Sequence, residues 1–395
     1  MTRPTLRRLV SLLVLATACT TRPSTVITPS SSGGVSDRAM RIYRDAIVTD
    51  AHNDMPTKVL DEHYDPDVRH RPGTGADQGE TDLPRLVESG ITGQFFSAWV
   101  DAPYARRNPD ASYERALEYV DSIRAFVARH PDRLTFATSA DGIRRAKRDG
   151  KIAVLIGVEG GHAIEASLDN LRELHRRGVR YLTLTWNNGN QWAGSSVGVD
   201  GTRTGGLTDF GREVVREMNR LGMLVDLSHV SEQTFFDAIA ASSVPVIASH
   251  SSARAIHDHP RNLTDAQLRA IARNGGVVNV NFYAAFIDAH FAAAKDSLER
   301  SLGASAAPRV HALPRPALSV LVDHIEHIAR VAGKDHVGIG SDFDGVGGLL
   351  PEGMEDVTRL PRIVQALLDR GWSESDIRKL LGENMLRVMD RARIR

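Results

Sequence analysis

The stretch Ile152-Ala-Val-Leu-Ile-Gly-Val-Glu159 is apolar almost throughout and ends in a single carboxylate. An apolar run of this length is typical of a parallel β-strand that is buried on both faces. Similar runs recur along the chain, and segments with helical spacing of their apolar residues separate them. This alternation predicts an α/β protein built on a parallel sheet.

Eight strand-like runs can be placed along the sequence. The predicted strands are residues 47–54, 93–100, 152–159, 181–186, 223–228, 244–249, 276–283 and 336–340. Helices are predicted between them, at residues 112–129, 168–177, 207–221, 231–241, 264–273 and 318–332, with a partly helical insertion at 284–316 and two final helices at 356–370 and 373–391. Eight strands joined by helices predict a (β/α)8 TIM-like barrel. The alternative is an open, doubly wound sheet, but no glycine-rich phosphate loop follows an early strand.

The composition agrees with one large folded domain. The chain has 395 residues, of which 42% are hydrophobic and 25% are charged. A barrel can use this length as a single domain, and the apolar content is sufficient for a core. Lys plus Arg and Asp plus Glu both number 49, so the charge balance gives no reason to expect a nucleic-acid partner.

The first residues have the pattern of an export signal. Three arginines in the first eight residues precede a short apolar run at 9–15, and the small residues 16–18 follow. The apolar run is too short to span a membrane. Cys19, the only cysteine, comes next and resembles the lipidated cysteine of a bacterial lipoprotein, although Leu15 stands one position further from it than is usual. An ordinary secretory signal with an incidental cysteine is the alternative.

The segment after Cys19 is rich in Ser, Thr, Pro and Gly and has no apolar periodicity, which predicts a flexible tether. We therefore expect a signal peptide at 1–18, a lipid-anchored linker at 19–37 and the barrel at 38–395. The expected location is the cell envelope, facing the periplasm or the exterior. Contact with the membrane is expected through the lipid anchor alone.

Polar residues stand where five of the predicted strands end. They are His52 and Asp54, Glu159, His229, His250, and Asp342 with Asp344. The C-terminal ends of barrel strands converge on one face, where the catalytic residues of such folds lie. His52 and Asp54 are two residues apart, so within a strand both would point to the same side.

These residue types suit a pair of divalent metals. His52, Asp54 and Glu159 would hold one metal, and Glu159, His229 and His250 the other, so that Glu159 bridges both. Imidazole and carboxylate favour zinc, although other divalent metals are compatible with them. Each set keeps an open position, and a paired site can generate a metal-bound hydroxide at neutral pH and polarise a carbonyl.

A series of motifs carries a resemblance to a known family. They are His52-Asn-Asp-Met-Pro56, Gly157-Val-Glu-Gly-Gly161, Tyr181-Leu-Thr-Leu-Thr185, Asp226-Leu-Ser-His229, Ser249-His-Ser-Ser-Ala-Arg254, His259-Pro-Arg-Asn262, Val280-Asn-Phe-Tyr283 and Gly338-Ile-Gly-Ser-Asp-Phe-Asp-Gly345. From about residue 47 to 389, the sequence resembles the renal, or membrane, dipeptidases, which are zinc peptidases of the amidohydrolase type. The resemblance implies a dipeptide substrate and two zinc ions bridged by Glu159.

The resemblance also implies roles around the metals. Asp342 would handle the proton, with Asp344 as the alternative for that role. Arg261 would bind the C-terminal carboxylate of the substrate, with Arg254 as the alternative. A guanidinium can bind a carboxylate with two hydrogen bonds, which agrees with this role. Tyr283 is expected in the pocket wall.

One position departs from the family pattern. After residues 181–185 the family has a histidine that helps to stabilise the tetrahedral intermediate, whereas this chain has Trp186 followed by Asn187 and Asn188. A tryptophan donates one hydrogen bond and cannot become cationic. Either asparagine or a neighbouring group would then stabilise the oxyanion, or the rate or the specificity differs. His162, His257 and His259 are expected to support the site or to face solvent rather than to bind metal.

The sequence therefore predicts a dizinc metallopeptidase that hydrolyses dipeptides. The alternative enzyme is an amidohydrolase-type deacylase acting on N-acyl amino acids, with Trp186 facing the acyl group. A non-catalytic, anchored binding protein is a third hypothesis, and the complete set of metal-binding residue types argues against it. A homodimer is compatible with the sequence.

Overall fold

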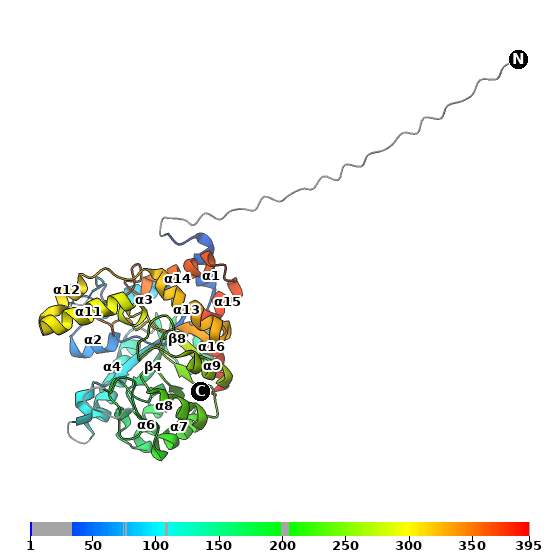
Figure 1. The fold of residues 1–395 in the computed structure, drawn as a ribbon. Coiled ribbons are helices and arrows are strands. Elements are labelled where there is room, and N and C mark those ends of the chain that lie inside the picture. Colours follow the sequence, from blue (N-terminus) through cyan, green and yellow to red (C-terminus); the bar gives the residue numbers. More distant parts are fainter. Residues whose placement is uncertain (2–33, 74, 76, 107–109, 199–204, 395) are drawn as a thin grey trace. The chain divides into compact units, whose positions relative to one another are not determined.

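Eight parallel strands form the centre of the molecule (Figure 1). They follow one another in the order β1 (Thr49–Asp50), β2 (Gly93–Trp99), β4 (Ile152–Glu159), β5 (Val179–Thr183), β6 (Leu224–Asp226), β7 (Ile247–Ala248), β8 (Val277–Val280) and β9 (Val337–Ile339). The ring closes between its first and last members, because Ala51 N donates to Ile339 O at 2.9 Å and Asp342 N donates to His52 O at 3.1 Å. The predicted (β/α)8 barrel is confirmed.

The computed structural model describes Met1 and residues 34–73, 75, 77–106, 110–198 and 205–394. Apart from Met1, the predicted signal peptide lies outside the described residues, and so do Cys19 and most of the predicted linker. Among the helices of the described part, none is long and apolar enough to cross a membrane.

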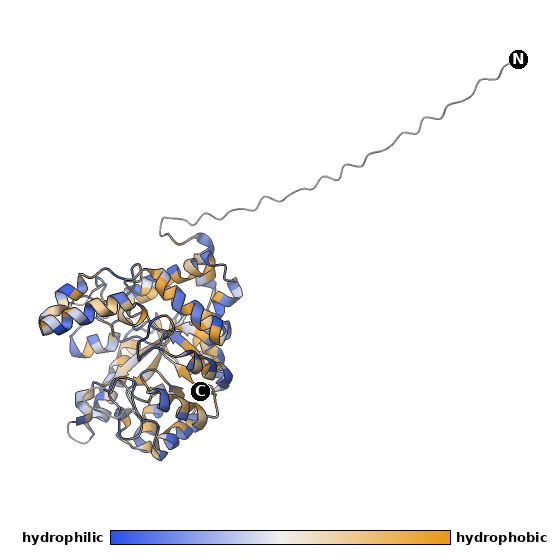
Figure 2. Cartoon of the chain, viewed as in Figure 1, coloured by the Kyte–Doolittle hydropathy of each residue, from blue (hydrophilic) through white to orange (hydrophobic). Residues whose placement is uncertain are grey.

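The central strand β4 explains how the sheet is buried. All eight of its residues are buried, and it pairs with β2 from Ala153 to Glu159, for example Phe95 with Leu155. Figure 2 shows apolar strands surrounded by helices that carry both apolar and polar positions. A further strand, β3 (Leu134–Phe136), pairs with the start of β4 and was not predicted. Its three residues are too few to show a periodicity.

The helices pack around this barrel. Their bounds are α1 Asp37–Asp45, α2 Met55–Asp61, α3 Leu83–Ser89, α4 Ala111–Arg129, α5 Ala140–Arg148, α6 Leu168–Arg176, α7 Asp209–Leu221, α8 Glu232–Ala241, α9 Asp265–Asn274, α10 Ala284–Ile287, α11 Ala289–Leu302, α12 Ala307–His311, α13 Leu318–Ala332, α14 Pro361–Asp369, α15 Glu374–Arg378 and α16 Asn384–Arg391. Side-chain caps fix several starts; Thr264, for example, forms a capping box with Gln267 at α9. The insertion after β8 folds as α10 to α12, shown in yellow in Figure 1.

Two expectations about elements were wrong. The first strand ends at Asp50, so His52 and Asp54 lie in the loop after it and do not share a strand face. Asp54 instead occupies the N-cap position of α2, because Pro56 favours a helix start there. The helix expected at 373–391 is interrupted by a π-helical turn, Lys379–Glu383. Gly382 of this turn packs so closely on Ile47 O that a Cβ would lie 2.5 Å from that oxygen.

Candidate metal centre

The five predicted metal-binding side chains meet at the C-terminal face of the barrel. His52 and Asp54 follow β1, Glu159 ends β4, His229 follows β6 and His250 follows β7. Three groups have ligand atoms that lie within 4.8 Å of one another. They are His52, Asp54 and Glu159; Glu159, His229 and His250; and His52, His250 and Asp342. The first two are the sets expected from the sequence.

The two oxygens of Glu159 face different partners. Oε2 lies 3.3 Å from His52 Nε2, which is also 3.1 Å from Asp54 Oδ2. Oε1 lies 2.8 Å from His229 Nε2 and 3.4 Å from His250 Nε2. Glu159 therefore stands between two half-sites, the arrangement that a bridging carboxylate requires.

Hydrogen bonds fix the tautomers of two imidazoles. His229 Nδ1 lies 3.0 Å from the amide oxygen of Asn187 and donates to it. The Ser249 hydroxyl donates to Asp226 Oδ2 at 2.6 Å, so it accepts from His250 Nδ1 at 2.8 Å. Both rings therefore carry their Nε2 lone pairs toward the centre, where the two nitrogens are 2.9 Å apart.

This geometry fits a bound cation. Two lone pairs at such a distance repel each other unless a positive charge lies near them. His52 Nε2 is fully buried and has no hydrogen-bond partner among the described residues. Three buried carboxylates, those of Asp54, Glu159 and Asp342, face the same space. Buried negative charge of this density requires positive charge beside it, and imidazole with carboxylate is a common ligand set for zinc.

The electrostatics of the cluster are strongly coupled. Burial would raise the pKa of Glu159, but the neighbouring imidazoles, that of His52 first, hold it well below its ordinary value. Burial lowers the pKa of His229 to about 3, and the positive charge of Arg261 acts in the same direction. Burial likewise lowers the pKa of His250 well below its ordinary value. Glu159 is thus ionised and these two imidazoles are neutral, as metal binding requires.

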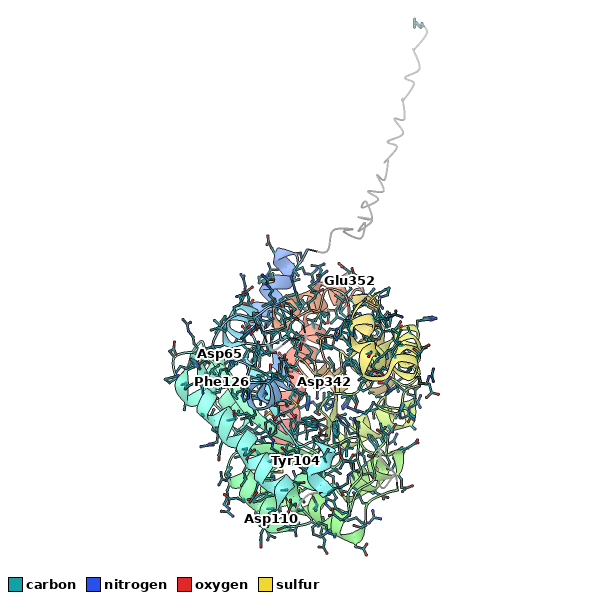
Figure 3. The ribbon with its side chains drawn as sticks, turned by 90° about the vertical axis from the view of Figure 1, so that its left-hand side faces the viewer. Asp65, Tyr104, Asp110, Phe126, Asp342 and Glu352 are labelled. Carbon is teal, nitrogen blue, oxygen red and sulfur yellow. The ribbon has the colours of Figure 1, made fainter. Side chains whose placement is uncertain are left out.

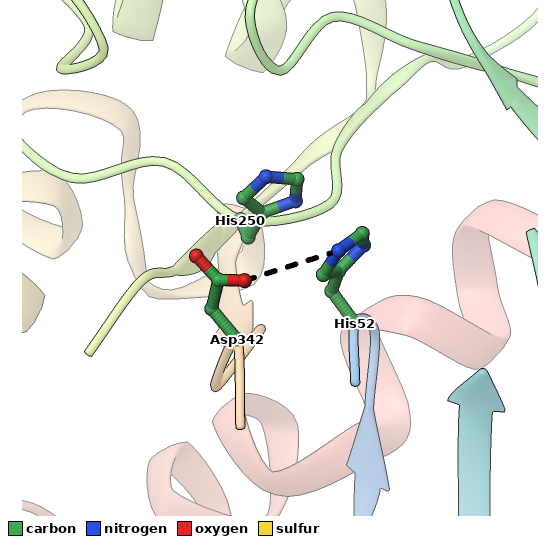
Figure 4. Close-up of side chains that lie close together, drawn as sticks. All are labelled: His52, His250 and Asp342. Carbon is green, nitrogen blue, oxygen red and sulfur yellow. Dashed lines mark ion pairs between the residues drawn. The ribbon is translucent and has the colours of Figure 1, made fainter. Parts of the chain in front are cut away.

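Asp342 stands beside the two half-sites (Figure 4). Its Oδ1 lies 3.9 Å from His52 Nε2, and Asn281 Nδ2 donates to its Oδ2 at 2.7 Å. In Figure 3 the residue lies inside the ring of helices. Burial raises the pKa of Asp342 to about 7, and the charge of His52 opposes that rise. A carboxyl group that titrates near neutral pH suits proton transfer.

Asp344, the alternative to Asp342, has a different environment. Its Oδ1 accepts from Glu80 N at 2.8 Å, and Glu80 Oε2 accepts from Asp344 N at 2.7 Å. This exchange fastens the loop after β9 to the segment before α3. The next residue, Gly345, packs closely against the centre, since a Cβ there would lie 2.3 Å from Asp54 Oδ2.

The guanidinium group of Arg261 faces the cavity that contains the ligand cluster. Its side chain is buried, and Nη2 donates to His250 O at 3.3 Å. Nε and Nη1 are buried and have no hydrogen-bond partner in the part of the chain that the structure describes. Burial lowers the pKa of Arg261 to about 10, so the group remains cationic at neutral pH. Arg254, the alternative, donates instead to the carbonyl groups of His259 and Pro260.

A cavity of about 440 Å³ connects these groups. Its lining includes Asp54, Glu159, His229, His250, Arg261, Asp342 and Asp344, together with the aromatic residues Trp99, Trp186, Tyr283 and Phe286. Trp186 and Trp99 make an edge-on contact with ring centroids 5.1 Å apart. Trp186 and Tyr283 therefore lie in the pocket wall, as expected from the sequence.

Several residues of the site were not singled out from the sequence. Trp99 ends β2, and its position at a strand end was a usable signal. Phe286 lies in α10, and Arg261 stacks over its ring at 5.3 Å. Asn281, Tyr181 and Ser249 belong to motifs that resemble the family, but the sequence alone indicates no partners for them.

The remaining polar residues near the motifs lie outside the ligand sets. His162 donates through Nε2 to Val100 O at 2.9 Å and accepts from Asn188 Nδ2 at 3.3 Å. Asn188 therefore turns away from the cavity, whereas Asn187 lines it. His259 accepts from Arg261 N at 3.2 Å and stacks on Phe286 with ring centroids 4.5 Å apart. It supports the Arg261 loop.

Comparison with known proteins agrees with this site. One similar structure is a metallopeptidase from Rhodobacter sphaeroides, liganded with a phosphinate mimic of the dipeptide L-Ala-D-Ala. Its sequence is 30% identical to that of this chain and the TM-score is 0.74; the match covers 88% of this chain and 100% of that chain. A metallopeptidase of family M19 named dipeptidase AC is also 30% identical, with a TM-score of 0.73 and coverage of 88% and 98%. The probable dipeptidase PvdM from Pseudomonas aeruginosa, at 24% identity, has the same fold, with a TM-score of 0.79 over 90% and 97% of the chains.

The family model described as membrane dipeptidase, peptidase family M19, matches residues 36–394. This range contains the entire barrel and every residue of the centre. It also contains the candidate metal-binding clusters that a metallopeptidase needs. The chain therefore belongs to the membrane dipeptidase family of metallopeptidases and is a hydrolase of peptide bonds.

Proposed function

We propose that this chain hydrolyses dipeptides with a free C-terminal carboxylate and that two divalent cations are held by its centre. The observation that carries the proposal is the position of Arg261. Its buried and unpartnered guanidinium nitrogens face the same cavity as the ligand cluster, as judged from the described residues. In a dipeptide, the peptide bond is one residue away from the C-terminal carboxylate. If Arg261 bound that carboxylate, the peptide bond would lie beside the ligand cluster.

His52, Asp54 and Glu159 would hold one cation, and Glu159, His229 and His250 the other. Zinc suits these ligands, and manganese or cobalt is compatible with them. The cations would supply a nucleophile from water at neutral pH and would polarise the scissile carbonyl. The hydrogen bonds from His229 to Asn187 and from His250 to Ser249 keep the ligand nitrogens unprotonated.

Asp342 would move the proton. Asn281 holds its Oδ2, so Oδ1 is the oxygen that faces the cluster. Oδ1 would accept the proton from the attacking water and donate it to the departing amine nitrogen. Burial raises the pKa of Asp342 above its ordinary value, which favours proton transfer to and from this carboxyl group.

The aromatic wall supports a second candidate substrate class. Trp99 and Trp186 form an apolar part of the cavity wall, and the Trp186 ring lies 6.4 Å from that of His229. This surface would accept either the side chain of a first residue or the acyl group of an N-acyl amino acid. Arg261 would bind the carboxylate in both cases.

A substrate panel separates these functions. The purified protein is stripped with a chelator, reloaded with zinc, and assayed with dipeptides, the matching dipeptide amides and N-acetyl amino acids. We expect hydrolysis of dipeptides only after reloading, and at least a hundredfold lower kcat/KM for the amides. Undiminished hydrolysis by the metal-free protein would overturn the metal-dependent mechanism. A preference for N-acetyl amino acids would favour the deacylase.

We also propose that the protein is exported and anchored through a lipid on Cys19, on the strength of the signal pattern in residues 1–18. Mass spectrometry of the mature N-terminus tests this proposal. The wild type is expected in the membrane fraction with a modified Cys19, and C19S in the soluble fraction. A free thiol at Cys19 in the exported protein would show the ordinary secretory alternative to be correct.

A further inference from the structure

The third imidazole of the centre has an unusual anchor. His52 Nδ1 lies 2.9 Å from the hydroxyl of Tyr181, and both side chains are fully buried. His52 follows β1, whereas Tyr181 lies in β5, and β2 and β4 stand between these strands in the barrel. The Tyr181 ring therefore crosses the barrel interior to reach His52.

Gly157 makes this crossing feasible. Gly157 and Tyr181 are direct neighbours in the pairing of β4 with β5. A Cβ at residue 157 would lie 1.8 Å from Tyr181 Cζ, which shows that the ring lies directly over the glycine. On the far side, Phe95 of β2 packs against the ring with centroids 5.4 Å apart. The ring thus packs on residues of β2 and β4, the two strands that separate β5 from β1.

The hydroxyl can set the tautomer of His52. When Tyr181 accepts from Nδ1, the lone pair of His52 stays on Nε2, which faces Asp54 and Glu159. The other two imidazoles have anchors of their own, Asn187 for His229 and Ser249 for His250. Loss of the Tyr181 hydroxyl should therefore affect one half-site and spare the other.

We propose that Tyr181 is a positioning residue for the half-site of His52, Asp54 and Glu159, and that Gly157 provides the space that seats it. This inference rests on the proposed metal-binding function. A partner that orients a ligand histidine typically contributes ten- to a hundredfold to metal affinity. The effect should appear as an asymmetry between the two half-sites.

Single-site backgrounds measure this asymmetry. H250A weakens the half-site that contains His229 and keeps the half-site of His52 intact. H52A weakens the half-site of His52 and keeps that of His229 and His250 intact. Zinc affinity is measured with metal buffers in each background, with and without Y181F. We expect Y181F to weaken zinc binding at least tenfold in the H250A background and to leave it unchanged in the H52A background.

N187A is the matched control, because Asn187 anchors His229 in the same way. It should weaken zinc binding in the H52A background and have no effect in the H250A background. G157A tests the seating of the ring and should reduce the affinity of the His52 half-site at least as much as Y181F. Y181F removes a single oxygen, so its result stands even when G157A does not fold.

Two results would overturn the inference: an unchanged affinity of Y181F in the H250A background, or equal weakening in both backgrounds. The proposed function is judged separately, on the wild type. A wild type that binds two zinc ions and cleaves no dipeptide overturns the proposed function and leaves the role of Tyr181 intact. A wild type that binds no zinc overturns both.

Discussion

Arg261 and Arg254 show how neighbouring residues of one type acquire different roles. Both belong to the segment after β7, and both carry the same charge. The Arg254 guanidinium is occupied by backbone carbonyl groups, whereas two nitrogens of Arg261 face the cavity without a partner among the described residues. A buried polar group without a partner is costly, so its retention points to a ligand that satisfies it.

We expect R261M to reduce kcat/KM for dipeptides about a hundredfold or more, because hydrogen bonds to charged groups contribute roughly 1.5–3 kcal/mol each. Most of the loss should appear in KM. R261K keeps the charge without the two-pronged geometry and should lie between the wild type and R261M. Steady-state kinetics with one dipeptide measure these effects. R254M is the control, and a larger loss for R254M than for R261M would assign the carboxylate to Arg254.

Asp342 and Asp344 can be separated in the same manner. We expect D342N to lower kcat about 10²- to 10⁴-fold, the usual contribution of general acid–base catalysis, while zinc content stays unchanged. D344N should remain within a few-fold of the wild type, because an amide oxygen can still accept from Glu80 N. Kinetics and metal analysis of both variants provide the test. The reverse ranking would exchange the two roles.

At the scale of elements, the turns that follow the strands place the donors. His229 and Asp342 both have positive φ, at 68° and 64°, and each stands three residues after the end of a strand, β6 and β9 respectively. Residues other than glycine rarely adopt this conformation, and it is often retained at functional sites. These turns direct the two side chains toward the centre.

The outer helices depend on more conventional contacts. Glu217 of α7 accepts from Arg172 of α6 at 2.6 Å and from Arg220 at 2.7 Å. The hydrogen bond from Arg220, followed by that from Arg172, lowers the pKa of Glu217 to about 2. The stabilisation is therefore complete above the ordinary glutamate pKa and is lost as the pH falls toward 2.

We expect E217Q to lower the free energy of unfolding by about 1 kcal/mol at pH 7, a modest value because solvent screens the exposed arginines. The difference between wild type and variant should shrink as the pH falls from about 4.5 toward 2. Urea denaturation at pH 7, 5 and 3 measures it. A difference that does not depend on pH would show that packing, and not charge, is responsible.

On the scale of the whole molecule, the centre joins parts of the barrel that are distant in sequence. Its ligands come from the ends of β1, β4, β6 and β7, and Asp342 follows β9. A cation bound there would link the first strand to the middle of the chain and relieve the repulsion between the imidazoles. A ligand that binds the native state and not the unfolded state stabilises the native state by mass action.

We therefore expect removal of the metals to lower the Tm. Free zinc at about a thousand times its Kd contributes about 4 kcal/mol, which corresponds to roughly 5 °C for a domain of this size. Calorimetry with chelator, followed by addition of zinc, measures the shift. In the double variant H52A/H229A the chelator should have little effect. An identical Tm for stripped and reloaded wild type would contradict the prediction.

The sequence determined the fold and the identities of the central residues. Burial on both faces leaves a continuous apolar signal in β4, and the ends of parallel strands converge by topology. These signals are local or follow from the barrel itself. They are sufficient to group Glu159 with the three histidines.

Only the tertiary structure decided which distant residues orient that centre. Tyr181 and His52 are 129 residues apart, and Asn281 and Asp342 are 61 apart. Trp99 joins the pocket only because β2 ends beside β4. Periodicity along a chain reports which side chains are buried, but not which partner each one meets across the barrel. Many side chains share the inner surface of the barrel, and the partner that each one meets depends on how these side chains pack against one another.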